Sequence, residues 1–243
     1  MLNRIIILGN SLSIPRPDDQ VDYVNTYPYI LVKSGYEVIN RSRRINDIEI
    51  QSTEQNMLDD VDYLRPDYVV IHLGIVECAP RIFSKKNRAY LRILPSKIRN
   101  FIINFLSKYR EIITKHRKIN YVDIVSFEAN FIQVINRIHS RNPSIKIVVI
   151  NINNTNMYNN KRSYGFNSNI NNYNDVINKL PFKFPINLYV INTNLHKGGL
   201  LNDGIHINSV MHKYISDQIL SIIRDLCINQ PNHNPQSSKI KTI

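Results

Sequence analysis

Five short apolar runs recur along the chain, separated by longer stretches with helical patterning. The runs lie at 4–9, 36–40, 68–74, 146–152 and 188–192. Mostly apolar runs of this length are typical of strands buried on both faces, and their alternation with helices favours a parallel sheet with right-handed crossovers. We therefore expect one α/β domain over residues 1–228, built as a three-layer α/β/α sandwich. The expected order of its five parallel strands is 2-1-3-4-5.

The connecting segments carry weaker signals. The spacing predicts helices at 20–34 (kinked or split by Pro28), 53–63, 98–117, 123–140, 172–180 and 209–227. We expect a basic, irregular lid over 82–97, a mobile Asn-rich loop over 153–172, and a disordered polar tail at 229–243.

Composition narrows the function classes. The 243 residues carry a net charge of +12, which favours anionic partners. Lys and Arg are spread along the chain, however, and no RNA-binding or zinc-finger motif is present, so we expect no nucleic-acid partner. Only two cysteines, Cys78 and Cys227, occur, and they lie far apart. This usage favours a reducing compartment, and we expect a cytoplasmic protein with no membrane span, no metal and no cofactor.

A candidate nucleophile follows the first apolar run. In Gly9-Asn10-Ser11 the strand ends at a turn that presents a hydroxyl at its carboxyl end, the edge where open α/β sheets build their sites. Serine needs a base, and the base needs an orienting partner. Asp203 and His206 are three residues apart, follow the last strand, and reach the same edge.

These segments resemble the SGNH, or GDSL, hydrolase superfamily. Gly9-Asn10-Ser11-Leu12-Ser13 is similar to its first block, Gly-Asp-Ser-Leu-Ser, and Asp203-Gly204-Ile205-His206 to its last, Asp-x-x-His. Gly74-Ile75-Val76-Glu77 stands where the block Gly-x-Asn-Asp belongs. The resemblance implies a flavodoxin-like sandwich and acyl-ester chemistry, with Ser11 as nucleophile, His206 as base and Asp203 as its orienting partner.

The middle of the chain departs from that family. Val76 replaces an Asn that would donate to the oxyanion, and Asn40-Arg41-Ser42-Arg43-Arg44 replaces a loop that usually contains Gly. We therefore expect an oxyanion hole built from the backbone N–H groups of Ser11 and Ser42. Side chains of Asn40 or Arg43 are the alternative donors.

Several polar residues near these blocks are candidates for substrate binding: Asn10, Arg16, Arg43, Glu77 and Arg81. Arg81 follows the third strand and could hold a carboxylate or phosphate, although a solvated arginine is an equal alternative. For Glu77 an ion pair with Arg81 or Arg43 is the other interpretation. His72, within a strand, is expected to be a hydrogen-bonded core residue.

The sequence thus predicts a serine esterase or acyltransferase acting on a small acyl ester, an O-acetyl group, of a carbohydrate. Its expected partner is a small-molecule or glycan ester. This ester could be anionic, because the basic loops could bind an acidic sugar. One alternative is a lipid ester or thioester hydrolase. Another is a non-catalytic module that binds glycan or protein, and Val76 keeps it open.

Overall fold

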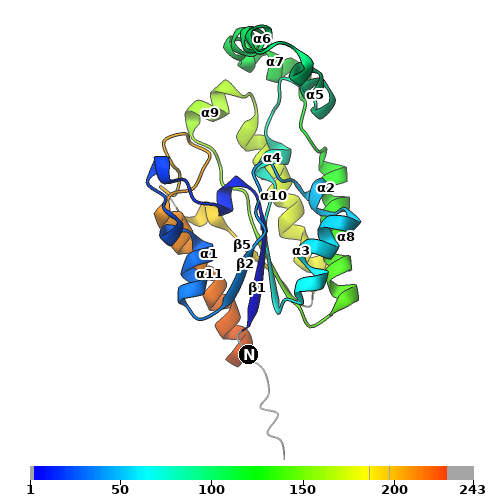
Figure 1. The fold of residues 1–243 in the computed structure, drawn as a ribbon, viewed down its shortest axis with the longest axis vertical. Coiled ribbons are helices and arrows are strands. Elements are labelled where there is room, and N and C mark those ends of the chain that lie inside the picture. Colours follow the sequence, from blue (N-terminus) through cyan, green and yellow to red (C-terminus); the bar gives the residue numbers. More distant parts are fainter. Residues whose placement is uncertain (1–2, 186, 197, 229–243) are drawn as a thin grey trace, which may run out of the picture.

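The chain forms a parallel sheet between two layers of helices in this computed structural model (Figure 1). The structure describes residues 3–185, 187–196 and 198–228, so the expected tail at 229–243 lies outside the described residues. The strands are β1 (Arg4–Gly9), β2 (Glu37–Asn40), β3 (Tyr68–His72), β4 (Lys146–Ile150) and β5 (Leu188–Ile191). Their order is β2-β1-β3-β4-β5 and every neighbouring pair is parallel, which confirms the predicted α/β/α architecture.

The central residues of the strands are apolar because helices cover both faces of the sheet. On one face, Ile5 and Ile7 of β1 pack in the cluster covered by α1 (Tyr27–Lys33) and α11 (Ser209–Ile228). On the other, Ile6 and Leu8 share a cluster with α2 (Ile48–Gln51), α3 (Glu54–Asp60), α8 (Ile124–Arg141) and α10 (Phe166–Lys183). The two layers stand on either side of the strands in Figure 1.

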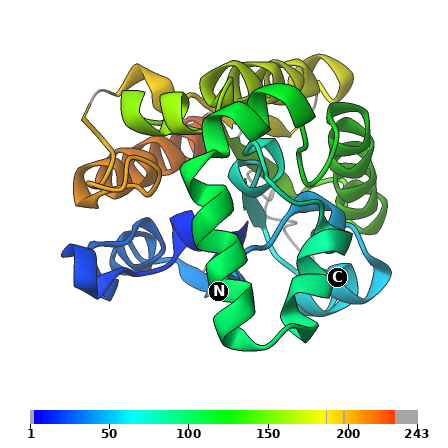
Figure 2. The same ribbon diagram turned by 90° about the horizontal axis from the view of Figure 1, so that it is seen from above.

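Three helices lie beyond the carboxyl ends of the strands, above α4 (Ile75–Cys78). They are α5 (Lys85–Ile93), α6 (Ser96–Lys108) and α7 (Arg110–Arg117), and Figure 2 shows them crossing over the top of the molecule. The prediction of an irregular segment over 82–97 is therefore wrong. Ser84 starts α5 by accepting the Asn87 amide at 3.3 Å, and Pro95 at the start of α6 separates the two helices.

The prediction of one long amphipathic helix over 98–117 is also wrong, because two helices cover this segment. The helix is interrupted at Tyr109, between α6 and α7. No side chain of α6 is buried, so its apolar residues do not enter the core. Phe101 and Phe105 stack with ring centres 6.3 Å apart while remaining 70% and 51% exposed. An apolar stripe at helical spacing therefore does not by itself say what the stripe packs against.

Most of the Asn-rich segment 153–172 is helical, so the prediction of a loop over its whole length is wrong. Asn156 accepts the Asn159 amide at 2.9 Å and starts α9 (Met157–Arg162), and Gly165, at φ +75°, starts α10. Asn is a strong N-cap residue, so this composition marks a helix start here. The helix predicted at 20–34 is shorter than expected, because residues Tyr23–Asn25 form a separate 3-10 turn and α1 begins only at Tyr27. Pro28 lies in the first turn of α1, so it stands at the start of the helix instead of kinking or splitting it. No helix in the described part of the chain is long and apolar enough to cross a bilayer.

Candidate active site

Ser11 is presented by a tight turn at the end of β1. The Asn10 side chain is fully buried, and its Oδ1 accepts the Leu12 amide at 3.0 Å. Gly9 is required for close packing, because a Cβ there would lie 2.5 Å from the hydroxyls of Ser13 and Ser42. Asn10 therefore shapes the turn, as its resemblance to the usual Asp implied. The structure shows no contact of its side chain with the cavity, so a direct role in binding substrate is not supported.

The segment after β5 delivers Asp203 and His206 to this turn. Asp203 Oδ1 accepts the amides of Ile205 and His206 at 3.0 and 2.9 Å, which fixes its carboxylate. Its Oδ2 lies 2.5 Å from His206 Nδ1, and His206 Nε2 lies 3.0 Å from Ser11 Oγ. The structure brings the three residues of the predicted triad together.

These contacts set the protonation states that nucleophilic attack needs. Burial pushes the pKa of Asp203 upward, but the hydrogen bonds from the Ile205 and His206 amides and the His206 ring outweigh burial and hold it below its ordinary value. A carboxylate beside Nδ1 favours the tautomer with the proton on that nitrogen. Nε2 is then the lone-pair nitrogen that faces Ser11 Oγ, the geometry of a general base.

The predicted oxyanion donor Ser42 is corrected by the structure. Its amide already donates to Asn40 Oδ1 at 3.0 Å, so it is not free for a substrate oxygen. The alternative side chains are engaged as well: Asn40 Nδ2 donates to Ser13 O at 2.8 Å, and Arg43 Nη2 lies 2.7 Å from both oxygens of Asp60.

Ile45 is the residue of this loop that sequence reasoning missed. It lines the same cavity as Ser11 and has a left-handed backbone, at φ +62°, which a β-branched residue rarely adopts. Among the described residues, no acceptor receives the amides of Ile45 or Ser11. Two residues that line one cavity thus each have an amide without an acceptor among the described residues. No sequence pattern indicates Ile45, because its distinguishing feature is its φ angle and not its residue type.

The cavity that holds Ser11 and His206 has a volume of about 360 Å³. Val76 and Arg81 also line it. The valine side chain offers no donor, and its carbonyl accepts from Arg81 Nη2 at 2.9 Å. Three more arginines that the sequence did not single out line this cavity: Arg88, Arg110 and Arg162.

Glu77 and Arg16 have other places than predicted. Glu77 is completely buried, with Oε1 accepting the Ile48 amide at 2.8 Å and Oε2 the Gly74 amide at 3.0 Å. It thus joins the loop after β2 to the end of β3 and is neither a substrate contact nor an arginine partner. Arg16 pairs with Asp19 at 2.8 Å, and its Nη2 lies 3.8 Å from Asp203 Oδ2, so it contacts the triad from outside the cavity lining. His72, as expected, is buried and bonded to Ser13, at 3.2 Å.

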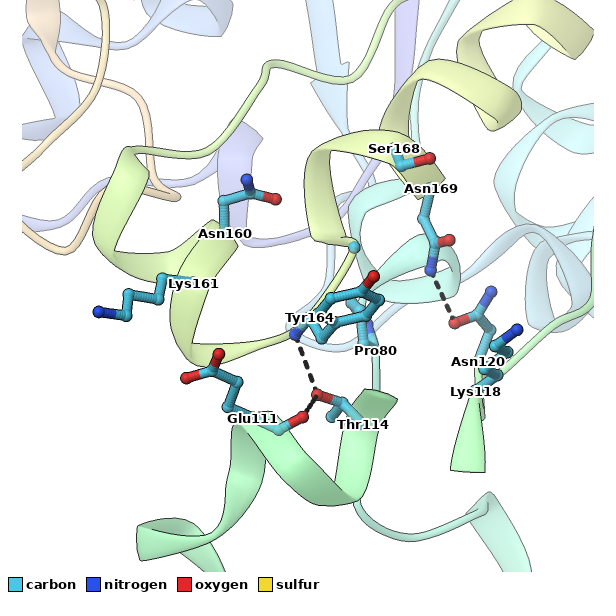
Figure 3. Close-up of a pocket in the computed structure, with 11 residues that line it drawn as sticks. Pro80, Glu111, Thr114, Lys118, Asn120, Asn160, Lys161, Tyr164, Ser168 and Asn169 are labelled. Carbon is cyan, nitrogen blue, oxygen red and sulfur yellow. Dashed lines mark hydrogen bonds between the residues drawn. The ribbon is translucent and has the colours of Figure 1, made fainter. Parts of the chain in front are cut away.

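A larger cavity of about 710 Å³ lies between α7, α9 and α10 (Figure 3). Its wall is polar: Thr114 accepts the Tyr164 amide at 3.0 Å, and Asn169 donates to Asn120 at 3.1 Å. No triad residue lines it. The smaller cavity is therefore the candidate active site. No cluster of His, Cys, Asp or Glu suited to a metal occurs among the described residues.

Comparison with known proteins defines the class of fold. No protein-family model and no curated protein matches the chain. A lipase/acylhydrolase from Enterococcus faecalis superposes with a TM-score of 0.63 at 16% identity, over 93% of this chain and 97% of that one. The acetyl xylan esterase AlAXEase gives 0.58 at 18% identity, over 90% and 99%. A carbohydrate esterase family 3 protein from Talaromyces cellulolyticus gives 0.57 at 14% identity, over 95% and 100%.

Proteins described as GDSL-family or GDSL-like are among the other matches. The chain has the fold of the SGNH (GDSL) hydrolase superfamily. The resemblance first seen in two short segments near its ends is thereby confirmed for the fold over nearly the whole chain.

Proposed function

We propose that this chain is a serine esterase or acyltransferase that removes or moves a small acyl group, an O-acetyl group, on a carbohydrate. The observation that carries the proposal is the contact series from Asp203 Oδ2 to His206 Nδ1, at 2.5 Å, and from His206 Nε2 to Ser11 Oγ, at 3.0 Å. The carbohydrate acceptor rests on the acetyl xylan esterase and carbohydrate esterase of the same fold. We also propose a cytoplasmic location, because the free, buried thiol of Cys78 is consistent with a reducing compartment.

The reaction would proceed by double displacement. Ser11 Oγ attacks the ester carbonyl carbon while His206 Nε2 takes its proton, and the Ser11 and Ile45 amides receive the developing oxyanion. The C–O bond to the sugar then breaks, and the sugar oxygen takes the proton from His206, leaving acyl-Ser11. Water or a second hydroxyl gives its proton to His206 and attacks the acyl carbon. The released Ser11 oxygen recovers the proton, yielding a carboxylic acid or a new ester.

The test is hydrolysis of an aryl acetate by the chain and by its Ser11→Ala and His206→Ala variants. Both substitutions should abolish turnover with circular dichroism unchanged, while Ser140→Ala, at an exposed hydroxyl bonded only to the Arg137 carbonyl, should leave it intact. A strict transferase would not hydrolyse the aryl acetate, but its activated Ser11 would still be labelled by a fluorophosphonate. An unlabelled, inactive chain would contradict the proposal and favour the non-catalytic binding module.

The lipid-ester alternative has less support. Four arginines line the cavity that contains Ser11, together with six apolar residues, and its volume is about 360 Å³. The apolar residues are Ile45, Ile75, Val76, Ala79, Phe166 and Ile205. A long acyl chain would share this small cavity with the guanidinium groups, whereas a short acyl group could contact the apolar side chains while a polar alcohol contacted the arginines.

A further inference from the structure

The cavity of Ser11 and His206 is lined by four arginines from different parts of the chain. Arg81 follows α4, Arg88 lies on α5, Arg110 begins α7 and Arg162 ends α9. Among the described residues that line this cavity, none is Asp or Glu. Four positive charges thus face the cavity with no negative charge in its wall.

None of the four has a carboxylate partner anywhere in the described part of the chain. The two inner arginines are held by neutral groups. Arg81 donates to the Val76 carbonyl and lies 4.3 Å over the Tyr121 ring, and Arg110 donates to Ser163 Oγ at 2.7 Å and to the Pro80 carbonyl at 2.8 Å. Elsewhere in this molecule, arginines such as Arg43 and Arg137 do pair with aspartates.

The outer pair is also neutral in its contacts. Arg88 Nη1 donates to the Tyr121 hydroxyl at 2.9 Å, and Arg162 Nη2 to Ser107 Oγ at 3.0 Å. Both arginines are exposed at the mouth of the cavity, whereas Arg81 and Arg110 are partly buried. The arrangement is an inner pair of cations with an outer pair around the entrance.

This arrangement costs stability without a ligand. Burial is the main cause that lowers the pKa of Arg81 and of Arg110. Tyr121 opposes this shift in both residues, and Cys78 and Glu77 oppose it in Arg81, whereas Arg88 lowers the pKa of Arg81 and both Arg81 and Arg162 lower that of Arg110. The Nε of Arg81 is moreover buried with no hydrogen-bond partner among the described residues. Like charges gathered in a partly dry wall are tolerated where an anion completes them.

We infer that the ester substrate carries an anionic group, the carboxylate or phosphate of an acidic sugar, which the inner and outer arginines bind while its acyl carbonyl lies at Ser11. Guanidinium groups suit both anions, since their planar N–H pairs match two oxygens at once. This inference rests on the proposed function and specifies its substrate class. It also assigns substrate binding to Arg88, Arg110 and Arg162, together with Arg81.

The test compares acetylated sugars that differ only in charge: an O-acetylated methyl glucoside, the matching methyl glucuronide, and the matching 6-phosphate. We expect kcat/KM to be about 10- to 100-fold higher for one or both anionic esters, as a charge-assisted contact contributes. A preference for the glucuronide identifies a carboxylate, and one for the 6-phosphate identifies a phosphate. Equal rates on all three would overturn the inference.

Variants then connect the preference to the cavity. Arg162→Gln, at an exposed position that folding tolerates, and Arg81→Gln, in the inner pair, should each reduce the charged-to-neutral rate ratio by about tenfold. Arg224→Gln, at an exposed site on α11 outside the cavity lining, should not change it. A ratio unchanged in Arg162→Gln and in folded Arg81→Gln would contradict the assignment.

Binding separates this inference from the proposed function. Calorimetry of the Ser11→Ala variant with methyl glucuronide and with glucose 6-phosphate requires no turnover. If either anion binds, and if its affinity falls when Arg162→Gln is added, the anion site is supported even if the chain hydrolyses no aryl acetate. Turnover of aryl acetate with no binding of either anion would leave the esterase standing and overturn the anion site.

Discussion

Glu77 accepts a hydrogen bond of 3.0 Å from the amide of Gly74, the residue at which β3 gives way to α4. Gly74 has φ +125°, and a Cβ there would lie 2.5 Å from Ile152, so the turn needs glycine. The other carboxylate oxygen accepts the Ile48 amide. One buried acid therefore joins the start of α2 to the turn before α4, and the nearby residues Ile45 and Ile75 line the cavity that contains Ser11.

This buried acid should make stability depend on pH. Burial raises the pKa of Glu77 from 4.5 to about 7, so between these values the folded state binds a proton that the unfolded state has lost. The free energy of unfolding should fall as pH rises through this window, by up to about 3 kcal/mol. Glu77→Gln should be less stable at pH 5, because it loses one accepted bond, but should lack this slope. Urea unfolding at pH 5 and 8 measures both, and an identical slope in the variant would refute the assignment.

Asp203→Asn should remove most of the activity while leaving the fold intact. The amide can still accept the Ile205 and His206 N–H groups, but it no longer stabilises His206 as it becomes charged. We expect kcat on an aryl acetate to fall by about 10³- to 10⁴-fold. Asp217→Asn, an exposed aspartate paired with Lys213, is the matched control and should keep full activity. A loss below tenfold in Asp203→Asn would show that the orienting contact is dispensable.

Ile45→Gly should stabilise the protein and preserve activity. The side chain is half exposed, so little buried area is lost, and glycine removes the strain of φ +62°, which is about 1–3 kcal/mol for a non-glycine residue. The greater entropy of the unfolded glycine offsets about 0.5–1 kcal/mol. Thermal unfolding should therefore shift upward by a few degrees. Val125→Gly, at an exposed helical position with ordinary φ, should shift it downward.

Val76→Asn tests whether the oxyanion site lacks a donor. The valine side chain lines the cavity and is 7% exposed, so asparagine would place an amide N–H beside Ser11 at some loss of stability. One such donor contributes about 10²- to 10³-fold in kcat in serine hydrolysis, and a gain of at least tenfold is expected. Val76→Ala changes the packing without adding a donor and should not raise kcat. No gain in the Asn variant would mean that the Ser11 and Ile45 amides suffice.

The strands and the triad could be predicted from local signals. A strand buried in a parallel sheet must be apolar on both faces, and the unbroken apolar run from Ile5 to Leu8 has this pattern. Ser11, Asp203 and His206 follow strand ends, and parallel strands bring their carboxyl ends to one edge. Position in the chain was therefore enough to place these three residues together.

The rest of the site depends on relationships that local patterns do not contain. The Ser42 prediction failed because the Asn40 side chain takes its amide, a choice made by side-chain geometry. Ile45 is marked only by its backbone angle. The arginine cluster arises because α5, α7 and α9 meet over the strand ends, and nothing in the spacing of Arg88, Arg110 and Arg162 specifies that meeting.

Different segments of the chain supply the triad and the arginines of the site. Ser11 comes from the first strand end and His206 from the last, whereas Arg81, Arg88 and Arg110 all lie between β3 and β4. That insertion could be exchanged for another without moving the nucleophile or its base. The bond-breaking chemistry and most of the proposed anion binding thus come from different segments. A graft of residues 79–118 onto a related scaffold would carry three of the four arginines, and Arg162 of α9 would have to be supplied separately.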